Sequence, residues 1–212
     1  MPSEWLRRHK RDQFHRLAKA RGFRSRASFK LLQINKQYRV IRSGQRVLDL
    51  GAAPGGWVQA ARQAVGTRGF VLGVDLQEIS PFPSSNVETI VGDISQADIV
   101  DNIQSKSGGG FDVVLSDLAP NVSGVWEVDH ARQIELARCA LRLGCRLIHS
   151  SGNMLIKVFQ GAETKDFENE MRKLFRAFRI VKPPASRPES AELFFLGLGF
   201  VGQPAAATDN RP

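Results

Sequence analysis

The chain contains 212 residues, and 42% of them are hydrophobic, which is enough for one domain with a sizeable core. No apolar run approaches the ~18 residues of a membrane span, and the charged start MPSEWLRRHKRDQ lacks the apolar region of a secretory signal. These features exclude a membrane-spanning protein and favour a cytoplasmic one. The two cysteines, Cys139 and Cys145, match no zinc-binding spacing, so reduced packing residues and no metal site are expected.

The excess positive charge is concentrated at the N-terminus. The net charge is +9, yet residues 1–46 contain 14 basic and two acidic side chains, and the remaining chain is net negative. A solvated tail is one interpretation. The other is a nucleic-acid surface, because aromatic residues among the basic ones allow base stacking beside phosphate contacts. The aromatic residues are Trp5, Phe14, Phe23, Phe29 and Tyr38.

The first predicted helix spans Ser25 to Tyr38. Its apolar residues follow helical spacing and form a buried stripe of Ala27, Leu31, Ile34 and Tyr38. Lys30 lies on the flank of that stripe. It either reaches inward to a site or covers apolar surface with its stem and keeps its ammonium in water, and the residues alone favour the second arrangement.

The stretch from Arg46 to Trp57 reads as a strand, a tight glycine-rich turn and the start of a helix. Glycines allow a ligand to approach the backbone closely, and the first N–H groups of the helix favour polar or anionic groups. A plain strand-to-helix turn is the alternative. The spacing differs from the dinucleotide fingerprint G-x-G-x-x-G, which argues against an NAD-dependent oxidoreductase.

Four successive predicted strands end at or beside an aspartate. Ligands of open α/β sheets bind at the carboxyl ends of strands, so four acids there indicate a pocket, although a single one is usually a helix cap. The four are Asp49, Asp75, Asp93 and Asp117.

Strands and helices alternate after residue 46, which predicts a doubly wound, mainly parallel α/β sheet. We expect an N-terminal RNA-binding extension with the first helix over 1–45, one catalytic domain over 46–202 and a disordered tail over 203–212. After the fourth strand the pattern predicts a helix at 129–149, a break at 151–153, a strand at 154–159, a helix at 164–175, and strands at 178–181 and 193–200.

Lys157 lies inside the apolar strand Met154–Phe159. A lysine in a core strand needs a partner, unless it lies near the strand end and reaches solvent. Asp117 and Glu192 are the available partners. A buried cluster of lysines and acids gives little stability, because desolvation offsets much of the attraction, so a catalytic role explains it better.

Six segments in order resemble the FtsJ/RrmJ family of S-adenosylmethionine-dependent RNA ribose 2′-O-methyltransferases. The resemblance covers residues 23–200 and implies a Rossmann-like methyltransferase fold with a seven-stranded, mostly parallel sheet and helices on both faces. The segments are DLGAAPGGW, VDL, GDI, SDLAPNVSG, IKVFQG and SRPESAELFF.

The resemblance also implies functions for individual residues. It makes Lys30, Asp117, Lys157 and Glu192 the catalytic group, with Lys157 as general base, and so turns Lys30 inward. Phe29 and Phe194 stand where the family often has tyrosine. The implied cofactor is S-adenosyl-L-methionine, bound by Gly51, Gly55, Gly56, Trp57, Asp75, Asp93 and Asp117. A role for Asp49 in holding the loop or the cofactor's amino group follows as well.

The implied substrate is a uridine ribose in 23S-type large-subunit ribosomal RNA or in the large ribosomal subunit, acted on by a monomer. A tRNA substrate and a catalytically silent RNA-binding assembly factor stay as alternatives. The segment DLAPN has no aromatic residue after its proline to stack a flipped base, which makes base methylation the weaker interpretation.

Overall fold

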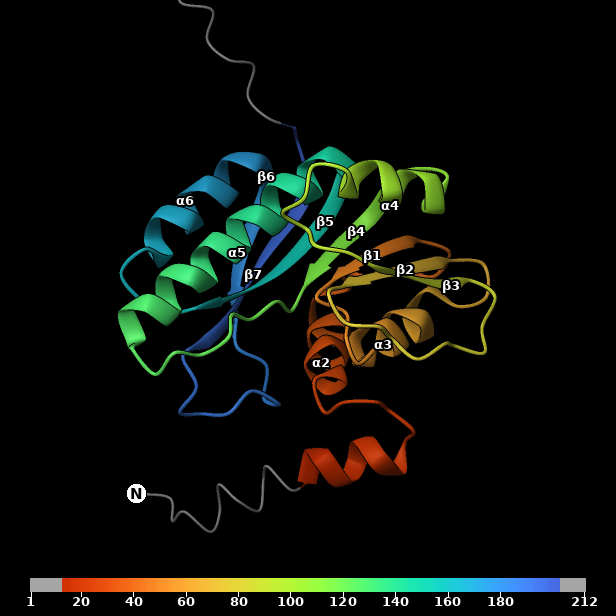
Figure 1. The fold of residues 1–212 in the computed structure, drawn as a ribbon, viewed down its shortest axis with the longest axis horizontal. Helices are drawn as coiled ribbons and strands as arrows, with labels where there is room; N and C mark the ends of the chain where they lie inside the picture. The colour runs from red at the N-terminus through yellow and green to blue at the C-terminus, as the bar shows by residue number, and fades with distance from the viewer. Residues whose placement is uncertain (1–12, 203–212) are drawn as a thin grey trace, which may run out of the picture.

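The computed structural model describes residues 13–202, and its centre is a seven-stranded sheet of order β3-β2-β1-β4-β5-β7-β6 (Figure 1). The strands are β1 (Arg46–Leu50), β2 (Phe70–Asp75), β3 (Val87–Val91), β4 (Phe111–Ser116), β5 (Ile148–Phe159), β6 (Phe175–Val181) and β7 (Glu192–Phe200). Strand β7 is antiparallel to β5 and β6, and the pairs from β3 to β5 are parallel. The predicted fold class is confirmed.

Helices cover both faces of the sheet (Figure 1). They are α2 (Ser28–Tyr38), α3 (Gly56–Val65), α4 (Ile99–Ser107), α5 (Trp126–Leu147) and α6 (Thr164–Leu174), and residues 13–20 are also helical. One apolar core lies between the sheet and α4, α5 and α6. A second lies under α2 and α3. Because α2 shares that second core, the boundary expected near residue 45 marks a change in charge and not a break in packing.

The central strands are apolar on both faces because helices cover both. In β1 only Arg46 is partly exposed, and in β4 only Asp112 is. Such continuous apolar runs are typical of parallel strands buried on two sides. Alternating residues of β5 then divide between the two cores, with Ile156 and Val158 under α5 and Leu155 under α2 and α3.

Several element boundaries differ from the sequence prediction, among them the start of α2, at Ser28 and not Ser25, and the start of β6, at Phe175 and not residue 178. Helix α5 begins at Trp126, three residues earlier than expected, and α4 was not predicted at all. The predicted break at 151–153 lies within β5, where the pairing with β4 shifts register and Ser151 has a φ of 64°. A β-bulge absorbs the residues that read as a loop, because the paired strand holds both sides of the irregularity.

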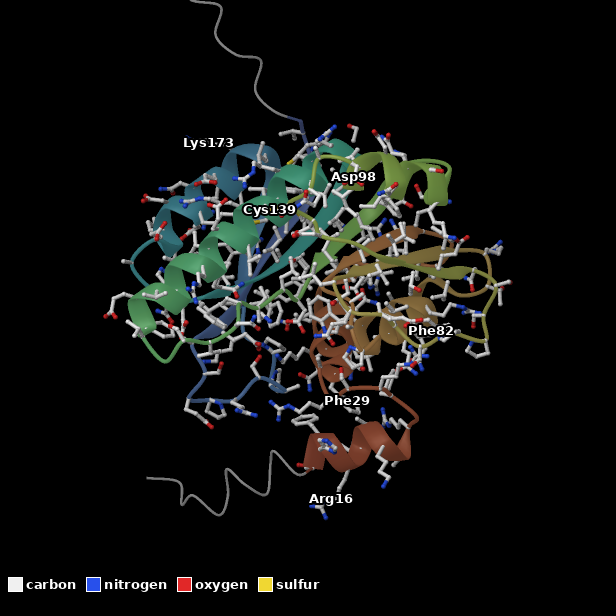
Figure 2. All side chains as sticks on the ribbon, in the orientation of Figure 1. Arg16, Phe29, Phe82, Asp98, Cys139 and Lys173 are labelled. Atoms are coloured by element: carbon white, nitrogen blue, oxygen red, sulfur yellow. The ribbon has the colours of Figure 1, made fainter. Side chains whose placement is uncertain are left out.

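The aromatic residues of the basic segment have mostly packed inward. Phe23 and Phe29 are buried with Ala185, and Phe14 packs on Phe29 with ring centroids 5.5 Å apart. Figure 2 shows Phe29 between the helix over 13–20 and the rest of the domain. The expectation that Phe23 and Phe29 stack on bases is therefore wrong. Trp5 and the tail at 203–212 lie outside the described residues.

Cys139 and Cys145 are both unpaired and partly buried against the first core, as predicted. Burial raises the pKa of the Cys145 thiol to about 11, which keeps the thiol protonated at neutral pH. No helix within residues 13–202 is long and apolar enough to cross a membrane.

Phe195 provides a test of the core. Its buried ring packs on Phe167 and Phe178, with centroid separations of 5.8 and 5.1 Å. We expect Phe195→Ala to lower the free energy of unfolding by about 3–5 kcal/mol in urea denaturation, because the side chain leaves a cavity. Ile180 pairs with Phe195 in register but is 47% exposed, so Ile180→Ala is the matched control and should change it by less than about 1 kcal/mol. Equal losses would contradict this assignment of the core.

Candidate active site

The glycine-rich turn after β1 requires glycine at two positions for both conformation and space. Gly51 has a φ of +79° and Gly55 one of +107°. A Cβ at Gly51 would lie 2.8 Å from the side chain of Leu118, and one at Gly55 would lie 2.6 Å from the ring of Phe82. Both conditions hold the turn in one shape at the carboxyl end of the sheet.

Gly56 and Trp57 hold α2 against α3. A Cβ at Gly56 would lie 2.1 Å from the Ser25 hydroxyl, and Ser28 Oγ donates a hydrogen bond to the Gly56 carbonyl at 2.9 Å. The indole N–H of Trp57 donates to the Ala27 carbonyl at 2.8 Å, and the ring is buried against Phe194. The side chain of Trp57 therefore positions the helix that carries Lys30, and its predicted contact with the cofactor stays a prediction.

Asp75 and Asp93 each order the loop that follows their own strand. Asp75 accepts hydrogen bonds from the backbone N–H groups of Ala53 and Gln77, both at 2.9 Å, and so ties the glycine-rich turn to β2. Asp93 accepts from the backbone and hydroxyl of Ser95, and these bonds hold the pKa of its carboxyl below the usual range. A carboxylate has further lone pairs, so both acids can still accept bonds from a ligand.

Asp49 is a fully buried acid without a hydrogen-bond partner for either oxygen among residues 13–202. Burial raises its pKa well above the usual value, and the nearby charges of Asp117 and Asp75 raise it further. An unpaired buried carboxyl is costly. A cationic ligand bound at this end of the sheet would remove much of that cost.

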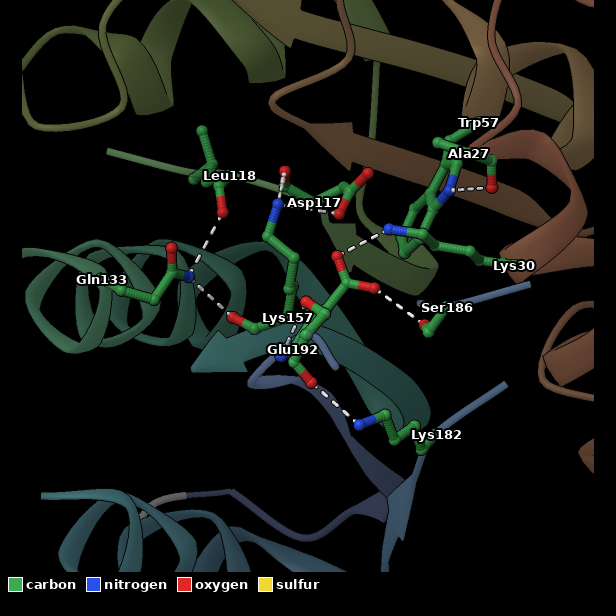
Figure 3. Close-up of polar contacts among 11 residues, drawn as sticks. Ala27, Lys30, Trp57, Asp117, Leu118, Gln133, Lys157, Lys182, Ser186 and Glu192 are labelled. Atoms are coloured by element: carbon green, nitrogen blue, oxygen red, sulfur yellow. Dashed lines mark hydrogen bonds and ion pairs between the residues drawn. The ribbon is translucent and has the colours of Figure 1, made fainter. Parts of the chain in front are cut away.

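Lys157 and Asp117 form a buried ion pair at the ends of β5 and β4 (Figure 3). The Lys157 ammonium donates to the Asp117 carbonyl at 2.7 Å and lies 3.0 Å from its Oδ1. The two side chains are 8% and 16% exposed. The predicted pairing is present, and the lysine does not reach solvent as the alternative required.

Lys30 and Glu192 form a second pair beside the first. Lys30 Nζ lies 2.6 Å from Glu192 Oε2, and Ser186 donates to Oε1 at 2.8 Å (Figure 3). Burial opposes ionisation of Glu192, but the charge and hydrogen bond of Lys30 outweigh it, and the pKa falls below the usual value. Lys157 adds to that effect, which places all four groups in one electrostatic unit. Lys30 thus points inward, as the resemblance implied.

Two supporting residues were missed by sequence reasoning. Gln133 of α5 donates from Nε2 to the carbonyls of Lys157 and Leu118, at 3.0 and 3.2 Å, and so joins the ends of β5 and β4. Arg24 bonds the carbonyls of Ser80 and Pro81 at 2.6 and 2.7 Å and stacks over Phe82. Both donate to backbone carbonyls. Every residue has such a carbonyl, so the sequence does not show which one will be the partner.

The site offers no evident metal position. Within residues 13–202 no three histidine, cysteine or acidic side chains are grouped closely enough to hold an ion. The expectation of metal-free chemistry stays a prediction.

Comparison with known proteins agrees with the geometry. The FtsJ-like methyltransferase family matches residues 23–200. "Ribosomal RNA large subunit methyltransferase E" of Methanothrix thermoacetophila is 46% identical, covering 94% of this chain and 76% of the relative. The protein of the same name from Methanothermobacter thermautotrophicus is 45% identical, covering 96% of both chains.

Solved structures share the fold. A candidate ribosomal RNA methyltransferase from Plasmodium falciparum superposes with a TM-score of 0.76 at 24% identity, covering 85% of this chain and all of that one. The MycE methyltransferase of mycinamycin biosynthesis, in complex with Mg and SAH, gives 0.56 at 16% identity, covering 94% of this chain and 52% of that one. These likenesses support the fold alone.

The seven-stranded, mostly parallel sheet with helices on both faces is a Rossmann-like methyltransferase fold, and these structures share it. The match over residues 23–200 and the identities near 45% are more specific. The chain belongs to the FtsJ-like methyltransferase family, and it is an enzyme of that class.

Asp49 generates a prediction about pH. Its raised pKa means that the folded state binds the proton more tightly than the unfolded state, so the stability this gives is lost as pH rises above about 4. We expect the free energy of unfolding of Asp49→Asn, which cannot ionise, to increase relative to that of wild type as the pH rises from about 4 to about 8. Urea unfolding without ligand measures this difference. A constant difference between the two proteins across that range would contradict it.

The Lys30–Glu192 pair generates a prediction about stability. Glu192→Gln should lower the free energy of unfolding by about 3 kcal/mol, because it leaves the Lys30 ammonium buried without its counter-charge. The double replacement Lys30→Met and Glu192→Leu should recover most of the loss, since two apolar groups replace two charges. Chemical denaturation of the three proteins measures both effects, and a double variant as unstable as Glu192→Gln would contradict the argument.

Proposed function

We propose that this protein methylates a ribose 2′-hydroxyl in RNA, most specifically a uridine of large-subunit ribosomal RNA, with S-adenosylmethionine as methyl donor. The observation that carries the proposal is the buried group of two lysines and two acids at the strand ends. The names of relatives near 45% identity support ribosomal RNA as the substrate class. A ribosomal substrate also supports the cytoplasmic location expected from the sequence.

The cofactor fits the residues present. S-adenosylmethionine supplies a methyl group already activated by a sulfonium. The orphaned carboxyl of Asp49 suits a cationic group, and the turn that follows, in which Gly51 and Ala53 are partly exposed and Gly55 and Gly56 are buried, would lie at the methionine portion. Asp75 would accept from ribose hydroxyls and Asp93 from the adenine amino group, with the oxygen lone pairs that their own loops leave unused.

The lysines and acids act on the acceptor. A ribose hydroxyl is a weak acid, so its proton must leave as the new oxygen–carbon bond forms and the carbon–sulfur bond breaks. Lys157 is the proposed base: its ammonium, which pairs with Asp117, must first release a proton, and Nζ then accepts the proton of the hydroxyl. Asp117 holds Lys157 at its present position, while Glu192 holds Lys30 beside it.

The basic N-terminal segment would hold the RNA. Its 14 basic residues, apart from Lys30, which is buried against Glu192, would give the electrostatic attraction to phosphate that sequence-independent RNA binding needs. The burial of Phe23 and Phe29 limits its role in base stacking. Binding through this segment should therefore weaken strongly with added salt.

Transfer of labelled methyl from S-adenosylmethionine tests the proposal. With undermethylated large subunits or their RNA, we expect label in a ribose 2′-oxygen, and a loss of at least ~100-fold in Lys157→Ala, because a positioned general base contributes that much. Lys165→Ala is the control, since Lys165 is 70% exposed on α6. It should retain full activity.

Other outcomes change the conclusion in defined ways. Label in tRNA would keep the chemistry and replace the substrate. Absence of label from every RNA, with S-adenosylmethionine still bound, would favour a silent assembly factor. Full activity in Lys157→Ala would show that Lys157 is not the general base.

A further inference from the structure

The segment that enters α5 carries an exposed apolar surface. Eight large hydrophobic side chains are exposed among residues 13–202, and half of them lie between 122 and 128: Val122, Val125, Trp126 and Val128. Trp126 is 46% exposed, whereas Trp57 is 3% exposed. Single exposed apolar side chains are ordinary, but a cluster with a tryptophan at its centre marks an interaction site.

The ring of Trp126 packs on two other aromatic rings of the protein. It stacks on His130 at a centroid distance of 6.1 Å and an angle of 21°, and on Phe159 at 6.2 Å and 25°. His130 is buried and accepts a hydrogen bond from the Glu163 N–H at 3.1 Å. Two near-parallel rings thus support the indole, so little conformational entropy is lost when a ligand stacks on it.

The loop before Trp126 is also fixed. Asp129 accepts hydrogen bonds from the backbone and hydroxyl of Ser123, both at 2.7 Å, and from the Gly124 N–H at 3.2 Å. These bonds hold the turn that starts α5. The exposed indole is therefore presented in a defined position by an ordered segment.

The Trp126 ring lies close to the end of β5, the strand that carries Lys157. Phe159 is the last residue of β5, two positions after Lys157 and about 7 Å further along the backbone. Gln133 on the same helix as Trp126 bonds the Lys157 carbonyl. In Figure 1 the start of α5 and the loop between β6 and β7 lie at the same end of the molecule. A nucleotide adjacent to one at Lys157 can reach this ring.

The chemistry around the ring favours a base over a phosphate. The first turn of α5 carries Glu127 and Asp129, whose negative charges repel phosphate from the helix start. A nucleobase has a neutral aromatic face, and unpaired bases in RNA are commonly recognised by stacking on such rings.

We propose that Trp126 is the stacking platform for an unpaired RNA base next to the nucleotide that receives the methyl group. This inference rests on the proposed function, because it takes RNA as the substrate. It adds a residue that binds substrate without taking part in proton or methyl transfer.

Steady-state kinetics with the RNA that accepts methyl tests this role. Trp126→Leu keeps an apolar side chain and removes the ring, so we expect KM for RNA to rise about tenfold. Both kcat and the affinity for S-adenosylmethionine should stay within about twofold. Trp126→Phe should restore most of the RNA affinity. Ile180→Ala is the matched control, because Ile180 is 47% exposed, like Trp126, but lies on the edge strand β6 outside this segment, and its KM should be unchanged.

A binding measurement separates this inference from the proposed function. Oligouridylate is added to wild type and to Trp126→Phe, and tryptophan fluorescence is followed. Quenching that wild type shows and Trp126→Phe lacks supports the stacking role even if no methyl is transferred. A wild-type KM in Trp126→Leu, or equal losses in Trp126→Leu and Ile180→Ala, overturns it and leaves the methyltransferase proposal intact. Absence of any quenching difference also overturns it.

Discussion

Lys30 and Glu192 are 162 residues apart in the chain and meet at 2.6 Å in a site almost closed to water. Two charges in such a place cost desolvation energy that only close geometry returns. The surrounding packing supplies that geometry. Gly56 lets the Ser28 hydroxyl reach its carbonyl, and Trp57 bonds the start of α2, so the helix that carries Lys30 is seated on α3. The packing of α2 on α3 therefore fixes the position of Lys30 relative to Glu192.

Charge is divided across the site in a way that suits the proposed reaction. Asp75, Asp49 and Asp117 follow one another along the ends of β2, β1 and β4, where a cationic cofactor would lie. Lys30 and Lys157 lie further along, toward β5 and β7. In the proposed reaction the acids would favour the cationic donor, and the lysines would face the acceptor hydroxyl. Asp117 belongs to both groups, since it is close enough to raise the pKa of Asp49 while it pairs with Lys157.

Much of this could be predicted from sequence because its signals are local. The glycine-rich turn, the strand-end acids and Lys157 in an apolar strand each depend on neighbouring residues. Phe23 and Phe29 were misjudged because their burial depends on Ala185, far along the chain. Gln133 and Arg24 were missed because they bond backbone carbonyls, which every residue has. The bulge in β5 was read as a break because only its partner strand stabilises it. The roles of the site residues in binding and catalysis remain predictions.

The central claim is that the four charged groups are retained for chemistry and not for stability. The most direct measurement is single-turnover methyl transfer by the Lys30→Met and Glu192→Leu double variant, at saturating S-adenosylmethionine and RNA, compared with wild type of equal folded fraction. The account predicts a folded protein that binds the cofactor and transfers methyl at least ~100-fold more slowly. A folded double variant with wild-type rate would contradict it, because the second buried pair would then contribute nothing to the reaction.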